Sequence, residues 1–168
     1  MVIGEAAICD VSADGFRLPT EAEWEYACRA GSTTAFANGE ITRLFCDHDP
    51  ILDAMGWYCG NSQRRTHQVA QKNANAWSLY DMHGNVSEWC QDSYAEYLEA
   101  PQKDPVGPPS GPARVVRGGS WFGSAKTCRS AHRFKWPPHS RNNLQIIGFR
   151  LVREPSPSGI PLGPLSDF

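Results

Sequence analysis

The chain has 168 residues, 40% of them hydrophobic, and a formal net charge of -2 at pH 7. This length supports one sizeable core but is short for two ordinary domains, and the near balance of charge disfavours a nucleic-acid partner bound through its phosphates. The sequence shows no basic start followed by a long apolar stretch, so we expect neither a signal peptide nor membrane insertion.

The first predicted element is a helix over residues 21–30. Thr20 is a good N-cap, and Glu23 follows it at the spacing of a capping box. Trp24 begins a stripe of apolar residues at helical spacing, which predicts that this face is buried. Gly31 is expected to end the helix.

Beyond this helix the sequence predicts irregular chain with a few short strands. Residues 32–76 are rich in turn formers and lack a sustained period, so we expect a long folded loop. Residues 114–121 are typical of a strand that runs into a glycine turn, and residues 146–152 of a closing strand, and we expect the two strands to be neighbours in one sheet. The Pro- and Ser-rich residues 154–168 are expected to form a flexible tail.

The six cysteines are too few for a disulfide scaffold. Cys46 and Cys59 flank a turn-rich stretch with three aspartates, for which a local disulfide is the preferred interpretation and a metal loop the alternative. Cys9 and Cys90 are expected to be buried as small apolar residues. Disulfides favour an oxidising compartment, whereas no signal is visible, so the compartment stays open.

No catalytic residue is predicted. The five histidines are scattered without the close spacing of a zinc site, and the GGS turn at 118–120 lacks the spacing of a phosphate loop. Four tryptophans with apolar neighbours are predicted to belong to the core: Trp24, Trp57, Trp77 and Trp89.

Four sequence blocks resemble, in order, those of the formylglycine-generating enzyme (sulfatase-modifying factor) family. They are RLPTEAEWEYACRAG at 17–31, LYDMHGNVSEWC at 79–90, RVVRGGSW at 114–121 followed by CRSAHR at 128–133, and IGFRLV at 147–152. The resemblance implies an irregular, C-type-lectin-like α+β domain of low secondary-structure content over residues 1–153, without the N-terminal portion that family members usually carry.

The resemblance also bears on catalysis. Active members are similar to copper-dependent oxidases in which two cysteines after the GGS turn hold the metal, and soft thiolates suit Cu(I). The first of those positions falls on Gly123 and the second near Cys128. The family pattern further pairs Cys128 with Cys28 in a disulfide, which leaves no thiolate. Ser87 also replaces a tryptophan of the family. We therefore expect no copper at this site.

A structural calcium site is implied by the same resemblance at Asp81, Gly84, Val86 and Glu88. Two side chains and two backbone carbonyls would supply the oxygen ligands that Ca²⁺ prefers. The alternative is that Asp81 is a turn former and that Glu88 pairs with an arginine.

A ligand-binding surface is predicted between residues 122 and 146. Its aromatic, hydroxyl and cationic side chains favour contact with a protein or peptide over a core role: Phe122, Ser124, Lys126, Thr127, His132, Phe134, Trp136, His139 and Arg141. The position is similar to the variable region of proteins of this fold that are diversified by a retroelement. An ordinary divergent loop is the alternative.

The sequence thus predicts a non-catalytic ligand-binding domain on a C-type-lectin scaffold, with structural calcium and with diversification by a retroelement as a further hypothesis. A formylglycine-generating oxidase or related sulfur-oxidising enzyme is the alternative, and a remnant without independent activity is a third. The oligomeric state is left open.

Overall fold

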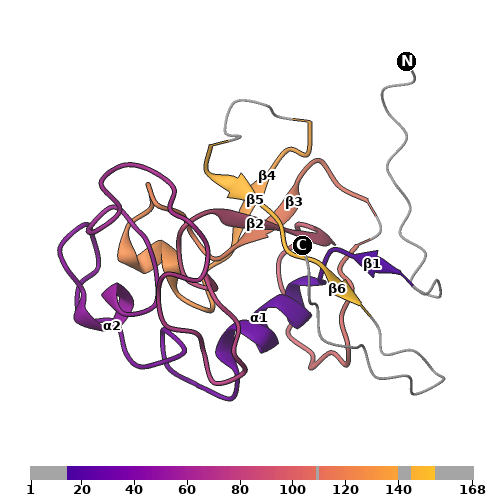
Figure 1. The fold of residues 1–168 in the computed structure, drawn as a ribbon. Helices are drawn as coiled ribbons and strands as arrows, with labels where there is room; N and C mark the ends of the chain where they lie inside the picture. The colour runs from indigo at the N-terminus through magenta and orange to yellow at the C-terminus, as the bar shows by residue number, and fades with distance from the viewer. Residues whose placement is uncertain (1–14, 109, 140–144, 154–168) are drawn as a thin grey trace. The chain divides into compact units, whose positions relative to one another are not determined.

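The computed structural model describes residues 15–108, 110–139 and 145–153, and little of this chain is regular structure. In chain order the elements are β1 (Phe16–Arg17), α1 (Glu21–Arg29), α2 (Pro50–Asp53), β2 (Ser87–Ser93), β3 (Arg114–Arg117), the 3-10 helix η1 (Ala125–Cys128), β4 (Phe134–Trp136), β5 (Ile147–Gly148) and β6 (Val152–Arg153) (Figure 1). The expected α+β class with low secondary-structure content is confirmed. The predicted tail, 154–168, lies outside the described residues.

The chain divides into two units. The described part of the first unit is the pair β1 and β6, which run antiparallel with Phe16 opposite Arg153. The second unit spans Leu18–Arg150 and holds the helices and the other four strands, so it contains every candidate site discussed below. Among the described residues, no helix has the length and apolar character needed to cross a membrane.

The larger unit is built on a four-stranded sheet with the order β4-β3-β2-β5. β3 pairs antiparallel with β2 and with β4, and β5 runs parallel to β2. β3 and β5 both belong to this sheet, but β2 lies between them, so the expectation that the two strands are neighbours is wrong. The predicted closing strand, 146–152, divides into β5 and the start of β6, and β6 pairs with β1 in a separate sheet. β2 was not predicted because its buried positions include two carboxylates, Glu88 and Asp92, which break the usual alternation of apolar and polar residues.

Helix α1 has the predicted capping box. Thr20 Oγ1 accepts a hydrogen bond from the Glu23 backbone N–H at 3.2 Å, and the Thr20 N–H donates to Glu23 Oε2 at 2.7 Å. The helix ends two residues before Gly31: Ala30 takes the left-handed conformation, with φ of 45°, and its N–H donates to Tyr26 O. Trp24 is 1% exposed, which confirms the buried stripe.

Two clusters of buried side chains make up the core. The first joins α1 to the sheet and consists of Trp24, Cys28, Met82, Cys90 and Val115. The second lies within the irregular chain between α1 and β2 and reaches η1; it consists of Phe36, Leu52, Tyr58, Ala125 and Cys128. Buried Cys90 confirms the prediction for that residue, whereas Cys9 lies outside the described residues. The prediction that Trp77 belongs to the core is wrong, because its side chain is 44% exposed and packs against Tyr26 on the surface.

The disulfide prediction is confirmed at one pair and wrong at the other. Cys46 and Cys59 are bridged, which closes a loop in the irregular region. Cys28 and Cys128 are separate buried thiols that belong to the two different core clusters. The His83 ring contacts both residues: it lies 3.8 Å from Cys28 Sγ, and its Nδ1 is 2.8 Å from Cys128 O. An imidazole therefore links the positions at which the family pattern implies a bridge.

Candidate functional site

A tight glycine turn places the predicted ligand-binding segment against the sheet. Gly118 and Gly119 both have positive φ, and a Cβ at Gly119 would lie 2.7 Å from Cys128 Sγ and 2.8 Å from Thr127 O. Only glycine allows η1 to approach the end of β3 so closely. Backbone hydrogen bonds then fix the segment to the irregular region, from the Cys59 N–H to Gly123 O and from the Ala125 N–H to Phe45 O.

A hollow of about 260 Å³ lies between this segment and the sheet. Five of the nine residues predicted to bind a ligand line it: Phe122, Thr127, His132, Phe134 and Trp136. We call it the aromatic hollow. The other residues that line it come from the glycine turn and from strands β2, β3 and β5 with their flanks: Ser87, Val116, Gly119, Ser120, Gly123, Ile146 and Ile147. The sequence argument missed Ser87 and Val116 because it predicted no strand at β2 and assigned no binding role to the strand at β3.

The remaining predicted residues lie around this hollow or beyond it. Ser124 O accepts a hydrogen bond from Thr127 Oγ1 at 2.7 Å, so Ser124 fixes the start of η1 and does not line the hollow. Lys126 is exposed, with its ammonium 5.6 Å from the centre of the Phe45 ring. His139 is exposed and follows β4. Arg141 lies outside the described residues.

The aromatic hollow combines exposed rings with an unsatisfied donor. Phe122 is 62% exposed and Phe134 is 50% exposed, and the two rings line the same hollow. Trp136 stacks on Phe134, with ring centres 5.6 Å apart, and its buried indole Nε1 has no hydrogen-bond partner among the described residues. A buried indole N–H normally has an acceptor. Burial, together with the cations Arg129, Arg117 and Lys126, lowers the pKa of His132, so its ring favours the neutral form.

The structure also describes the two positions, Gly123 and Cys128, at which the resemblance implies copper ligands. Gly123 has no thiol, and a Cβ at this position would lie 2.5 Å from Thr127 Oγ1, which occupies the space of a side chain. Cys128 is fully buried, and burial raises its pKa to about 12. A single protonated thiol is a poor ligand for Cu(I), because the thiolate is the species that binds metal. The residues present therefore do not fit a two-cysteine copper site.

The four residues of the implied calcium site lie in and just before β2, but not all of their oxygens are available to bind a cation. Glu88 binds Arg150 with both carboxylate oxygens and also accepts a hydrogen bond from Trp24 Nε1 at 2.6 Å. Asp81 accepts a hydrogen bond from the Ala70 N–H through Oδ2, whereas its buried Oδ1 has no partner in the part of the chain that the structure describes. Among the described residues, no three acidic, histidine or cysteine side chains come together to hold a metal ion.

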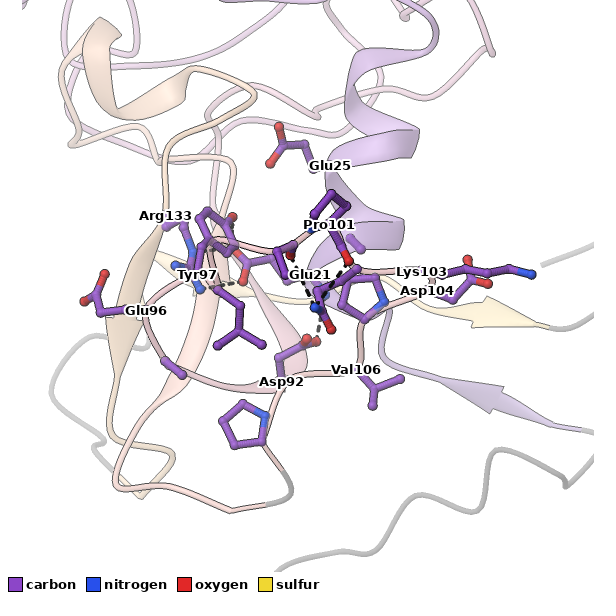
Figure 2. A pocket seen from close by; sticks show the side chains of 18 of the residues that line it. Glu21, Glu25, Asp92, Glu96, Tyr97, Pro101, Lys103, Asp104, Val106 and Arg133 are labelled. Carbon is purple, nitrogen blue, oxygen red and sulfur yellow. Dashed lines mark hydrogen bonds and ion pairs between the residues drawn. The ribbon is translucent and has the colours of Figure 1, made fainter.

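A larger hollow, of about 1080 Å³, lies between the start of α1, the end of β2 and the loop over residues 95–108. Figure 2 shows Arg133 beside Glu21 and Tyr97 in its wall. Arg133 binds both oxygens of Glu21, at 2.5 and 2.7 Å, and stacks 3.8 Å from the centre of the Tyr97 ring. Tyr97 in turn donates to Glu21 Oε1. The hydrogen-bonding groups of Arg133, Glu21 and Tyr97 are thus paired with one another, and the three residues form a structural network.

Comparisons with known proteins agree with this architecture. The model of the family described as sulfatase-modifying factor enzyme 1-like domain matches residues 2–155. A formylglycine-generating enzyme of Streptomyces coelicolor is 35% identical over 159 residues, which cover 83% of this chain and 47% of that protein. The serine/threonine-protein kinase pkn1 of Chlamydia caviae is 36% identical over 143 residues, which cover 83% of this chain and 21% of that protein.

A solved structure with a similar fold supports the same family relationship. Variable protein 1 of Treponema denticola has a TM-score of 0.76 and 40% sequence identity, and the match covers 84% of this chain and 49% of that one. The chain thus spans about half of that structure and between about a fifth and a half of the two curated relatives. The family match covers nearly all of the chain, and the chain belongs to the sulfatase-modifying factor enzyme 1-like domain family.

Proposed function

We propose that this chain is a non-catalytic domain that binds a protein or peptide through the aromatic hollow. The observation that carries the proposal is the convergence of Phe122, Thr127, His132, Phe134 and Trp136 on one cavity. Exposed aromatic rings around a small concave site are typical of the central residues of an interface. The likeness to a protein named as variable supports the same function, and diversification of residues 122–146 by a retroelement is part of the proposal.

The alternative is an oxidase like the formylglycine-generating relatives. Against it stand the missing thiol at Gly123, the Thr127 side chain in its place, and the high pKa of Cys128. Incubation of the chain with Cu(I), oxygen and a cysteine-containing peptide tests this alternative directly. We expect no conversion of the cysteine, and turnover would contradict the non-catalytic assignment.

Binding is tested with a displayed library of random peptides. The library is selected on the wild-type chain, on the double variant Phe122→Ala/Phe134→Ala, and on Leu98→Ala. Leu98 is a matched control because it is 71% exposed and lines the larger hollow instead. We expect enrichment on the wild type and on Leu98→Ala and its loss on the double variant. Equal enrichment on all three would place the binding surface elsewhere.

Calcium is a further part of the proposal, as a structural ion bound weakly near Asp81. Its support is the buried Asp81 Oδ1, which has no hydrogen-bond partner among the described residues. The family pattern implies backbone ligands from Gly84 and Val86 for the same ion. Glu88 forms an ion pair with Arg150, so few charged ligands remain for calcium. A site with few charged ligands has a low affinity for Ca²⁺.

A further inference from the structure

Acidic and basic residues are distributed unevenly along the chain, which the net charge of -2 does not show. Residues 105–153 contain none of the eighteen acidic residues but nine of the sixteen basic ones, namely Arg114, Arg117, Lys126, Arg129, Arg133, Lys135, Arg141, Arg150 and Arg153. This stretch includes β3, η1, β4 and β5 and most of the residues that line the aromatic hollow. The part of the sequence that supplies most of the hollow's lining is therefore free of acidic residues and rich in basic ones.

Several of these cations are neutralised inside the larger unit. Arg133 pairs with Glu21, Arg117 with Glu25, and Arg150 with Glu88. Lys126 and Arg129, by contrast, have no carboxylate within ion-pair distance in the part of the chain that the structure describes, and the Arg129 guanidinium donates from Nε to the backbone oxygen of Lys126.

These two free cations adjoin the aromatic hollow. Lys126 is next to Thr127 in η1, and the Arg129 carbonyl accepts a hydrogen bond from the His132 N–H, while Thr127 and His132 both line the hollow. Both cations act on the His132 ring strongly enough to lower its pKa, after the larger effect of burial. No described residue that lines the hollow carries a carboxylate.

The size of the hollow limits what can enter it. About 260 Å³ is less than the roughly 300–1,000 Å³ of pockets that bury a drug-sized ligand, so the space suits one large side chain of a polypeptide. Its walls are the rings of Phe122, Phe134 and Trp136 with Ile146 and Ile147, which favour an apolar occupant.

We propose that the partner is an acidic segment of a protein, which inserts an apolar side chain into the aromatic hollow and places its carboxylates against Lys126 and Arg129. The inference rests on the proposed function and specifies the chemistry of its ligand. Cations at the rim of an interface speed association and make binding sensitive to salt, while the buried apolar group supplies most of the affinity.

The test uses synthetic peptides with a central phenylalanine flanked by glutamates, by serines or by lysines, and a glutamate peptide with a central alanine. We expect the glutamate–phenylalanine peptide to bind at least about tenfold more tightly than the other three, with an affinity that falls as salt rises. Lys126→Gln/Arg129→Gln should remove the preference for glutamate. Arg64→Gln/Arg65→Gln, which removes two exposed cations away from the hollow, is the matched control and should keep it.

The outcomes separate this inference from the proposed function. If selected library peptides depend on Phe122 and Phe134 but show no preference for acidic flanks, the ligand chemistry is wrong and the binding function stands. If glutamate peptides bind equally well with a central alanine, the apolar insertion is wrong. A single-stranded oligonucleotide that displaces the glutamate–phenylalanine peptide at equal concentration would overturn the acidic-protein partner in favour of nucleic acid.

Discussion

Arg150 binds Glu88 through two hydrogen bonds, at 2.5 Å from Nε to Oε2 and at 2.7 Å from the second guanidinium nitrogen to Oε1. Arg150 also donates to Tyr80 O at 3.2 Å, so its guanidinium covers the loop before β2. A bidentate arginine–carboxylate pair of this kind is among the stronger polar contacts in proteins. It supplies positive charge at the place where the family pattern implies a calcium ligand, as the arginine alternative predicts for Glu88.

The first prediction concerns calcium. We expect calcium to raise the unfolding temperature only at millimolar concentration, because Glu88 is not available and a ligand that binds only the folded state stabilises it by mass action. Asp81→Asn, which keeps an acceptor for the Ala70 N–H, should abolish the rise. Arg150→Gln should be less stable in chelator and should gain more from calcium, since it frees Glu88. No shift in the wild type at any concentration would leave Arg150 as the cation of this site.

The second prediction concerns Gly123, the first position at which the family pattern implies a copper ligand. Gly123→Cys should lower the free energy of unfolding by about 1–3 kcal/mol, because the new Cβ meets Thr127 Oγ1 at 2.5 Å. Gly123→Cys/Thr127→Ala should recover most of that loss. Neither variant should oxidise a cysteine-containing peptide with Cu(I), because Cys128 stays buried with a raised pKa. Denaturant unfolding and peptide mass measure the two effects, and turnover by either variant would contradict this account.

The third prediction is a pH dependence that arises at His83. This ring is fully buried, donates from Nδ1 to Cys128 O and accepts from the Ala37 N–H through Nε2, and desolvation lowers its pKa to about 4. The unfolded chain takes up this proton near the ordinary value of 6.5 and the folded chain only near 4, so stability falls as the pH is lowered through that window. The loss attributable to His83 is about 3 kcal/mol, at about 1.4 kcal/mol per pKa unit.

Denaturant unfolding between pH 7 and pH 4 measures this effect. His83→Gln, whose amide can both donate and accept, should flatten the pH dependence whatever its stability at pH 7. His48→Gln is the control, because the His48 side chain is 74% exposed, and it should follow the wild type. If His83→Gln loses stability on acidification as steeply as the wild type, the buried ring is not the cause.

The fourth prediction concerns the disulfide between Cys46 and Cys59. The bridge closes a loop with a sequence separation of 13, and a loop of about this length gives roughly 3 kcal/mol through the reduced entropy of the unfolded chain. Cys46→Ser/Cys59→Ser should lower the free energy of unfolding by about 2–4 kcal/mol. A reductant should do the same to the wild type and leave the double variant unchanged. An equal effect of reductant on both proteins would assign the loss to another cause.

Local sequence signals account for the parts of the fold that could be predicted. The capping box at Thr20 and Glu23 and the turn-rich loop between Cys46 and Cys59 depend on residues close in sequence, and both appear as expected. β2 was missed because its inward positions carry Glu88 and Asp92, whose partners, Arg150 and the Glu21 N–H, are distant in the chain. The burial of a charged side chain can be predicted only when its partner is known, because an unpaired charge is costly to bury.

The sequence predicted part of the lining of the candidate site but not its shape. The composition of residues 122–146 predicted an aromatic and cationic surface, and five of the nine residues named there line the aromatic hollow. The hollow itself depends on contacts across the sheet to Ser87 and Val116 and on the close approach of η1 at Gly119, which no local pattern encodes. The implied bridge between Cys28 and Cys128 failed for a similar reason, because His83, far from both in sequence, contacts both residues.

The most direct test of the central claim is the dissociation constant of a library-selected peptide for the wild type, Phe122→Ala, Phe134→Ala and the control Leu98→Ala. If the aromatic hollow is the binding site, each of the first two substitutions weakens binding by at least about tenfold, which is about 1.4 kcal/mol, while Leu98→Ala stays within about twofold. Equal dissociation constants for all four proteins would contradict the assignment of this surface as the ligand-binding site.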